Sequence, residues 1–262
     1  MRILFLGDIV GRPGCRAVCA LLPRLIDRAR IAFVIANCEN ASAGGAGIDP
    51  VRAQELLASG VDVLTTGNHV LRRQEIAPML AEEPRLLRPA NFPPGVPGSG
   101  VLIGETAEGT PVAVVNVLGR VFMDSVDCPF RVVEAVLDGL RAQARVVVVD
   151  MHAEATSEKN AMGWFLDGKV SAVVGTHTHV QTADERILPR RTAFVTDVGM
   201  CGPLHSVIGV KPEAALRRFI TKMPVRYEVA TGPVLVQAVV IDVDCVTGEA
   251  TAIERLQEQW EP

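Results

Sequence analysis

Short apolar runs rich in β-branched residues alternate along this chain with longer segments whose apolar residues recur at helical spacing. Strands are expected at residues 2–7, 32–36 and 62–66. Helices are expected at 13–28, 50–59 and 73–81, the second opening with Asp49-Pro50 as cap and first helical residue. Such alternation is typical of strands buried on both faces beneath layers of helices.

A long irregular connection is expected at 84–100, because this stretch holds five prolines and three glycines. A hairpin of 100–104 with 111–117 follows, and a second hairpin, 233–243 with 249–256, closes the chain. The alternation between them predicts strands at 145–150, 170–174 and 192–196 and helices at 130–142, 158–166 and 212–222. We interpret residues 1–262 as a single domain with two sheets.

Charge and apolar content exclude several classes of protein. With 26 Lys and Arg against 30 Asp and Glu, the chain has no general attraction for nucleic acid or anionic membrane. No segment approaches the roughly 18 apolar residues that span a bilayer, and the run Ile3–Leu6 is too short for a signal peptide. A cytoplasmic protein is expected, whose six cysteines act as small buried hydrophobic residues.

Polar side chains follow five of the predicted strands at the point where each strand ends. These side chains include four of the five histidines. In chain order they are Asp8; Asn37, Glu39 and Asn40; Asn68 and His69; His152; and His177 and His179. Each has an ordinary alternative when taken singly, such as a helix cap for Asp8 or a core histidine for His152. Because ligands bind at the carboxyl ends of strands in open α/β sheets, the five groups together predict one site.

The ligand types in this set are imidazole nitrogen, carboxylate oxygen and amide oxygen. They suit Mn²⁺, Fe or Zn²⁺ and do not require a thiolate. In an extended chain, the spacing of His177 and His179 would place both rings on one side. The set exceeds what one tetrahedral ion needs, and two ions about 3.5–4 Å apart sharing a carboxylate would use all of it. Such a pair suits hydrolysis of a phosphate ester.

The order Gly-Asp, Glu-Asn, Gly-Asn-His, a lone His and Gly-x-His-x-His resembles the calcineurin-like metallophosphoesterases. Segments 7–11, 37–40, 152–159, 175–184 and 196–200 resemble their bacterial YmdB-like subfamily. Two motifs depart from the wider superfamily, which usually has Asp-x-His where this chain has Asp8-Ile9-Val10 and Asp where it has Glu39. The subfamily shares both departures, and they imply that Asn40 takes the place of the missing histidine.

The resemblance implies a four-layer α/β sandwich of two central mixed sheets flanked by helices. It assigns one metal ion to Asp8, Glu39, Asn40 and His179, and a second to Glu39 as the bridge with Asn68, His152 and His177. Iron is the expected metal, with manganese as the alternative. The implied reaction opens 2′,3′-cyclic nucleotides to 3′-nucleotides by attack of a metal-bridged hydroxide, and His69 acts as general acid.

Other functions for the same residues stay open at this point. A phosphomonoesterase or a 3′,5′-cyclic nucleotide phosphodiesterase would use the same metals, and a regulatory nucleotide-binding protein would need little turnover. The expected partner is a small cyclic nucleotide or another phosphodiester, without membrane or general nucleic-acid binding; a homo-oligomer is compatible with the family. Arg120, Phe122 and His205 receive no assigned role.

Overall fold

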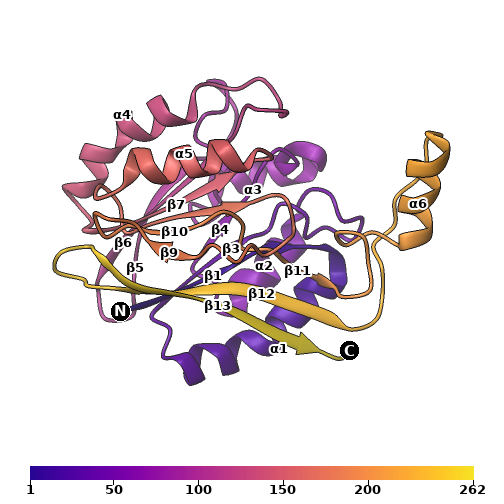
Figure 1. The fold of residues 1–262 in the computed structure, drawn as a ribbon, viewed down its shortest axis with the longest axis horizontal. Helices are drawn as coiled ribbons and strands as arrows, with labels where there is room; N and C mark the ends of the chain where they lie inside the picture. Colours follow the sequence, from indigo (N-terminus) through magenta and orange to yellow (C-terminus); the bar gives the residue numbers. More distant parts are fainter.

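Two β-sheets stacked face to face form the centre of the molecule, and helices cover their outer faces (Figure 1). The computed structural model describes residues 1–262. Side chains of both sheets meet in a buried apolar layer that includes Phe5, Ile35, Val114 and Val148. The layers are therefore helix, sheet, sheet and helix, which confirms the predicted four-layer sandwich.

Both sheets are mixed. The seven-stranded sheet has the order β2 (Asp8–Ile9), β11 (Met200–Pro203), β12 (Val234–Val243), β1 (Arg2–Leu6), β3 (Phe33–Asn37) and β4 (Val63–Thr65), with β13 (Ala250–Trp260) also paired to β12. The six-stranded sheet has the order β5 (Val101–Glu105), β6 (Pro111–Leu118), β7 (Val146–His152), β8 (Ala172–Thr176), β10 (Ala193–Val195) and β9 (Arg186–Ile187). Strands β1, β3 and β4 are parallel, as are β6, β7, β8 and β10.

The helices begin and end close to the predicted residues, with one exception. They are α1 (Gly11–Ala29), α2 (Pro50–Ala58), α3 (Ala77–Glu82), α4 (Pro129–Arg141), α5 (Thr156–Leu166) and α6 (Pro212–Thr221). The side chain of Asp49 caps α2 by accepting from the Arg52 amide at 3.0 Å. The helix predicted to start at residue 73 starts at Ala77, because Pro78 fits only the first turn; two short 3₁₀ turns precede it.

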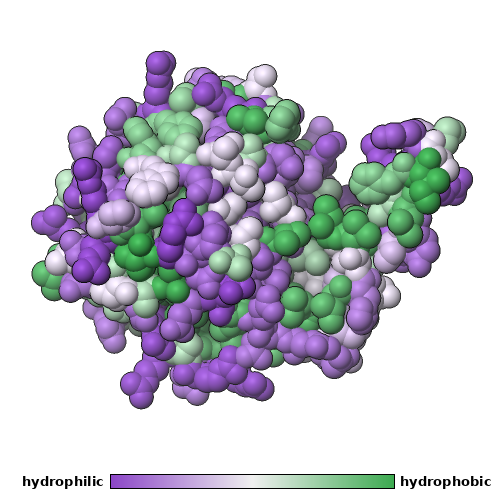
Figure 2. Space-filling model, in the orientation of Figure 1, coloured by the Kyte–Doolittle hydropathy of each residue, from purple (hydrophilic) through white to green (hydrophobic).

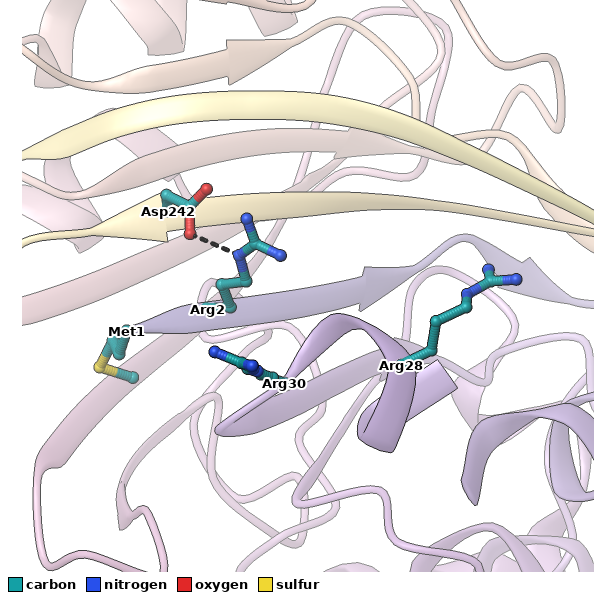
Figure 3. A pocket seen from close by; sticks show the side chains of 5 residues that line it. All are labelled: Met1, Arg2, Arg28, Arg30 and Asp242. Atoms are coloured by element: carbon teal, nitrogen blue, oxygen red, sulfur yellow. Dashed lines mark hydrogen bonds and ion pairs between the residues drawn. The ribbon is translucent and has the colours of Figure 1, made fainter. Parts of the chain in front are cut away.

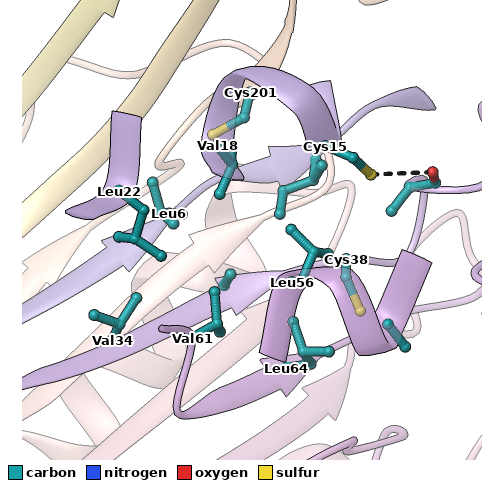
Figure 4. Close-up of a cluster of buried hydrophobic side chains, with 14 of the residues drawn as sticks. Leu6, Cys15, Val18, Leu22, Val34, Cys38, Leu56, Val61, Leu64 and Cys201 are labelled. Carbon is teal, nitrogen blue, oxygen red and sulfur yellow. Dashed lines mark hydrogen bonds between the residues drawn. The ribbon is translucent and has the colours of Figure 1, made fainter. Parts of the chain in front are cut away.

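A second apolar layer joins the first sheet to α1 and α2 (Figure 4). Leu6, Val34 and Leu64 of the sheet face Val18 and Leu22 of α1 and Leu56 of α2 in this cluster. Three cysteines lie in the same layer, namely Cys15, Cys38 and Cys201, and all six cysteines are free thiols. These three confirm the expectation of buried cysteines, whereas Cys19, Cys128 and Cys245 are only half-buried.

Residues 204–232, here called the arm, leave the body after β11 and carry α6 outward (Figure 1). At the base of the arm, the Leu204 amide donates to the Pro233 carbonyl, and Val210 pairs with Val229. Figure 2 shows apolar side chains on the surface of the projecting part. Phe219 and Ile220 of α6 are among the exposed residues. None of the helices combines the length and the apolar character that crossing a membrane requires.

Candidate metal centre

The carboxyl ends of strands from both sheets meet at one edge of the sandwich. β1, β3 and β4 lead into Asp8, Glu39 and Asn68, while β7 and β8 lead into His152 and His177. A hydrogen bond between the sheets, from Asn37 Nδ2 to Asp150 Oδ2 at 3.1 Å, joins the two sets just below this edge. The convergence predicted from the five strand ends is confirmed.

Glu39, His152 and His177 form the tightest group at this edge. His152 Nε2 lies 3.1 Å from Glu39 Oε1 and 3.1 Å from His177 Nδ1. The ligand atoms of the three residues lie within 4.8 Å of one another, so they are placed to hold a metal ion. Asn68 is the fourth residue assigned to this ion, and its Oδ1 is buried without a hydrogen-bond partner.

A second group lies on the other side of Glu39. Asn40 Nδ2 is 3.1 Å from both Glu39 Oε1 and His179 Nε2. His179 Nε2 in turn lies 3.7 Å from Asp8 Oδ1. Glu39 therefore contacts both groups, which is the position that a bridging carboxylate requires.

Two features of this edge fit a cation. The buried oxygens Asp8 Oδ1 and Asn68 Oδ1 lack hydrogen-bond partners, a costly state for polar atoms removed from water. Gly67 lies directly beside two of the candidate ligands, and an added Cβ there would lie 2.2 Å from His152 Nε2 and 2.4 Å from Glu39 Oε2. Carboxylate, amide and imidazole groups with unused lone pairs are the donors that iron, manganese and zinc accept.

The two histidines after β8 reach the edge in an unexpected conformation. They do not continue an extended strand: His177 has φ 102° and His179 has φ 64°, in the left-handed region that side chains disfavour. The His177 amide donates to Asp8 Oδ2 at 3.0 Å, and Thr178 donates to Asp197 Oδ2 through its amide and its hydroxyl. These bonds hold the strained loop and point both rings at the acids.

Asp197 is itself held by a buried ion pair. Lys159 Nζ, from α5, lies 2.7 Å from Asp197 Oδ2, and both side chains are inaccessible to solvent. The Lys159 chain runs beside Gly175, where an added Cβ would lie 2.8 Å from Lys159 Cδ. The pair thus ties α5, the end of β10 and the histidine loop together.

A second buried carboxylate orients His152. Asp150 accepts hydrogen bonds from Thr65 at 2.5 Å, from Asn37 at 3.1 Å and from Thr176 Oγ1 at 2.7 Å. Because the Thr176 hydroxyl donates to Asp150, it accepts from His152 Nδ1 at 2.8 Å, and this leaves Nε2 to face Glu39. Sequence reasoning assigned no role to Asp150, Lys159 or Asp197, although a charged residue within the apolar run of β7 is a detectable signal.

His69 lies beside the centre, with its Nδ1 3.4 Å from Glu39 Oε1. Its Nδ1 is 2.9 Å from Asn40 Oδ1, and its backbone amide donates to Glu39 Oε2 at 3.1 Å. The ring lines the adjoining cavity, and its Nε2 forms no hydrogen bond within the chain. This geometry leaves Nε2 free to contact a bound molecule.

Electrostatics within the centre are set by burial and by the acids and histidines themselves. Burial opposes ionisation of Glu39, yet His152 and His69 lower the pKa of Glu39 well below its usual range. Burial also opposes protonation of His152, but Glu39, Asp8 and Asp150 raise its pKa to about 9. Burial raises the pKa of Asp8 to about 6. Burial and the charge of His152 lower the pKa of His177 to about 3. Without metal, Glu39 and protonated His152 therefore form an ion pair, which a cation would replace.

A cavity of about 490 Å³ opens beside these residues. Its lining includes Glu39, His69, His177 and His179 on one side and residues of the arm on the other. Arg120, Phe122 and His205, to which the sequence assigns no role, are not among its lining residues. A cavity of this volume is of the size that holds a small molecule such as a nucleotide.

A larger cavity of about 580 Å³ lies elsewhere (Figure 3). Met1, Arg2, Arg28, Arg30 and Asp242 line it, at the start of β1 rather than at the end that leads to Asp8. Arg2 is already paired with Asp242 at 2.9 Å, and Arg28 with Glu258. It lacks histidine and unpaired acid, so the metal-ligand chemistry belongs to the smaller cavity.

Comparison with known proteins finds relatives along almost the whole chain. The family model described as YmdB-like protein matches residues 4–256. A 2′,3′-cyclic-nucleotide 2′-phosphodiesterase of Bacillus subtilis (strain 168) is 46% identical over 256 residues, which cover 98% of this chain and 96% of that protein.

Two solved structures have the same fold. A hypothetical protein from Thermus thermophilus superposes with a TM-score of 0.92 at 42% identity and covers 100% of both chains. A novel phosphatase from Mycoplasma pneumoniae also superposes with a TM-score of 0.92, at 32% identity, and covers 100% of this chain and 94% of its own.

Proposed function

The chain belongs to the YmdB-like family, and from this membership we propose that it is a metal-dependent phosphodiesterase that opens 2′,3′-cyclic nucleotides to 3′-nucleotides. The observation that carries the proposal is the pair of buried, unpartnered oxygens of Asp8 and Asn68 at the edge where Glu39 also lies. Glu39, His177 and His179 from the same edge line a cavity large enough for a nucleotide. The 2′,3′-cyclic substrate is the one named for the Bacillus subtilis relative.

Two metal ions per chain are proposed, most simply iron, with manganese as the alternative. Asp8, Glu39, Asn40 and His179 would hold one, and Glu39, Asn68, His152 and His177 the other. Asn40 would bind through its carbonyl oxygen, so its amide group must rotate from the orientation in which Nδ2 faces His179. When bound, the ions supply positive charge to the phosphodiester and lower the pKa of water to near neutrality.

His69 is proposed as the general acid. Its backbone amide donates to Glu39 Oε2 at 3.1 Å and its Nδ1 lies 3.4 Å from Glu39 Oε1, so the Glu39 carboxylate would still position the residue after the Asn40 amide has rotated. Its Nε2 can then donate a proton to the 2′-oxygen as that oxygen leaves phosphorus. Proton donation of this kind contributes about 10²–10⁴-fold to the rate.

The remaining polar residues orient those that would bind metal. Asp150 acts on His152 through Thr176, and Glu154 Oε2 lies 3.0 Å from His177 Nε2, which leaves His177 Nδ1 to face the centre. Partners of this kind set the tautomer and direction of a histidine ligand. Glu154 lines the cavity, whereas Asp150 and Thr176 do not.

Metal analysis combined with a substrate panel tests the proposal. The purified protein, reconstituted with Fe²⁺ or Mn²⁺, should hold two ions per chain and convert 2′,3′-cyclic AMP to 3′-AMP much faster than it hydrolyses 3′,5′-cyclic AMP or p-nitrophenyl phosphate. A single ion at saturation would overturn the dinuclear site. Preference for the monoester or for the 3′,5′-cyclic compound would overturn the substrate assignment, and two bound ions without turnover would favour a regulatory nucleotide-binding protein.

The role of His69 is tested by changing the leaving group. The variant His69→Ala should keep both metal ions and lose about 10²-fold or more on 2′,3′-cyclic AMP, whose ribose oxygen needs a proton. Its loss on bis-p-nitrophenyl phosphate should be small, because p-nitrophenolate leaves as a stable anion. Equal losses on both substrates, or loss of a metal ion, would place His69 among the ligands instead.

A further inference from the structure

The cavity beside the metal centre has two chemically different walls. The first carries Glu39, His69 and the two loop histidines. The second comes from the base of the arm and is mainly apolar, with Ile208, Val210, Tyr227 and Val229; its one charged residue, Glu228, is paired with Lys211. A molecule held by its phosphate at the first wall would place its remaining atoms against the second.

Tyr227 is the aromatic residue of this wall and the one tyrosine in the chain. Its ring is partly exposed, at 42% of the residue surface, although it lies in a cavity wall. Arg218 Cζ, from α6, lies 5.7 Å from the centroid of the ring, within the range of a cation–π contact. A neighbouring cation of this kind limits the positions that the ring can adopt.

The backbone around Tyr227 is held on both sides of the arm. The Lys211 amide donates to the Glu228 carbonyl at 3.0 Å, and Val210 pairs with Val229 in an antiparallel bridge. Val229 also contacts the Gly-rich loop of residues 44–47, where a Cβ on Gly45 would lie 2.6 Å from its methyl group. The apolar wall is thus fixed to the body next to the metal centre, although the arm beyond it projects outward.

We propose that the base of the arm is the nucleoside subsite of the enzyme, and that Tyr227 stacks on the base of the substrate; this rests on the proposed function. Ile208, Val210 and Val229 supply an apolar floor for the base and the sugar. Every nucleobase presents the same kind of π-face, so stacking tolerates all four bases. The inferred substrate class is 2′,3′-cyclic nucleotides irrespective of the base, with kcat/KM values that agree within about tenfold.

Two cyclic phosphodiesters distinguish the contribution of this subsite from that of the metal centre. Both 2′,3′-cyclic AMP and glycerol 1,2-cyclic phosphate contain a strained five-membered ring, but only the first carries a base. The variant Tyr227→Ala should lose about tenfold in kcat/KM on 2′,3′-cyclic AMP, mainly through KM, the order expected for one lost base–aromatic stack. Its loss on the glycerol compound should stay below about twofold, because the metal centre and His69 are untouched.

Two further variants complete the design. Tyr227→Phe keeps the aromatic face and should restore most of the lost kcat/KM. Phe122→Ala removes an exposed aromatic residue that does not line the cavity and should leave both substrates unaffected. Equal losses on both substrates for Tyr227→Ala, or no loss on either, would overturn the subsite.

A binding measurement keeps the inference testable even if turnover is absent. Calorimetric titration with 3′-AMP should show about tenfold weaker binding to Tyr227→Ala than to the original chain, whereas titration with inorganic phosphate should show no difference. This result with no hydrolysis of either cyclic compound would reject the proposed function and leave the subsite standing. Hydrolysis of the cyclic compounds together with equal 3′-AMP affinity in both proteins would support the proposed function and reject the subsite.

Discussion

The metal centre and the arm occupy opposite walls of one cavity, yet they are built in opposite ways. Asp8, Glu39 and His152 are fully buried, and each is bonded to residues from distant parts of the chain. On the arm, Phe219 and Ile220 project with 68% and 80% of their surface exposed. The arm is tied to the body mainly at its base.

The difference follows from what each region places next to the substrate. Charged groups taken out of water are tolerated only with well-placed partners, so a change at the centre disturbs several residues at once. An apolar wall depends only on its shape. An exposed side chain farther out on the arm makes few contacts, so its substitution removes few. The comparison predicts large effects at the centre and small ones along the arm.

The largest effect is expected from Glu39→Gln. An amide cannot supply negative charge to two cations, so the variant should hold metal weakly and lose more than about 10³-fold in kcat, the equivalent of several kcal/mol of charge stabilisation. Metal content per chain and turnover on 2′,3′-cyclic AMP measure it. Full metal content with near-normal turnover would show that Glu39 is not the bridge.

Gly67→Ala should follow, because the new Cβ would overlap His152 and Glu39. Displacement of these groups by about 1 Å is expected to lower kcat by about 10²-fold and to weaken metal binding. Gly139→Ala is the matched control: its Cβ would meet no atom within 4 Å, and it lies inside α4. The control should gain about 0.5–1 kcal/mol in stability with unchanged activity. Equal behaviour of the two variants would contradict the close packing around Gly67.

Asp197→Asn tests the ion pair beneath the histidine loop. Removing one partner of a buried pair leaves the Lys159 charge unpaired, at a cost of about 3–5 kcal/mol, and the weaker support for His177 and His179 should lower metal affinity by about 10–100-fold. Asp242→Asn, in an exposed pair with Arg2, should change stability by less than about 1 kcal/mol. Thermal unfolding and metal titration give both readouts. Lower stability with unchanged metal affinity would mean that the pair supports the fold and not the site.

Metal affinity should depend on pH through His152. Its pKa of about 9 in the metal-free protein means that a proton must leave before the ring can bind a cation. The affinity should therefore rise by about tenfold per pH unit from pH 7 to 9 and level off above. The stability of the metal-free protein should show the opposite trend: the contribution of this raised pKa should be complete below pH 6.5 and be lost as pH rises through 9. Titrations with Mn²⁺ at several pH values check the first trend, and a flat profile would contradict the Glu39–His152 ion pair.

The smallest effect is expected from Ile220→Ser on the arm. The side chain is mostly exposed, so stability should change by less than about 0.5 kcal/mol and kcat/KM by less than about twofold. Leu22→Ala in α1, fully buried against the first sheet, should instead cost about 2–5 kcal/mol. Thermal unfolding of the two variants measures both changes in stability. A large loss of activity for Ile220→Ser would show that the projecting part of the arm takes part in catalysis.

Much of the fold and the composition of the centre could be predicted before the structure. The spacing of apolar residues predicted the strands and helices. A strand buried on both faces gives a continuous apolar run, whereas a helix buried on one face has apolar residues three or four positions apart. Polar residues immediately after apolar runs marked the strand ends, and parallel strands bring such ends together. Local sequence was less reliable at Gln74–Ile76, where the helical spacing continued although Pro78 prevented an α-helix from starting earlier.

By itself, the sequence determined which elements form and which side chains gather at one edge, since both depend on local spacing and on strand direction. Only the tertiary structure decided how the side chains are aimed. The left-handed turns at His177 and His179 exist because Asp8 and Asp197 bind the loop from other elements, and Asp150 acts on His152 only through a hydroxyl of a neighbouring strand. The position of the arm base beside the centre could not be predicted from the sequence either, because contacts between residues far apart in the chain leave no local periodicity in it.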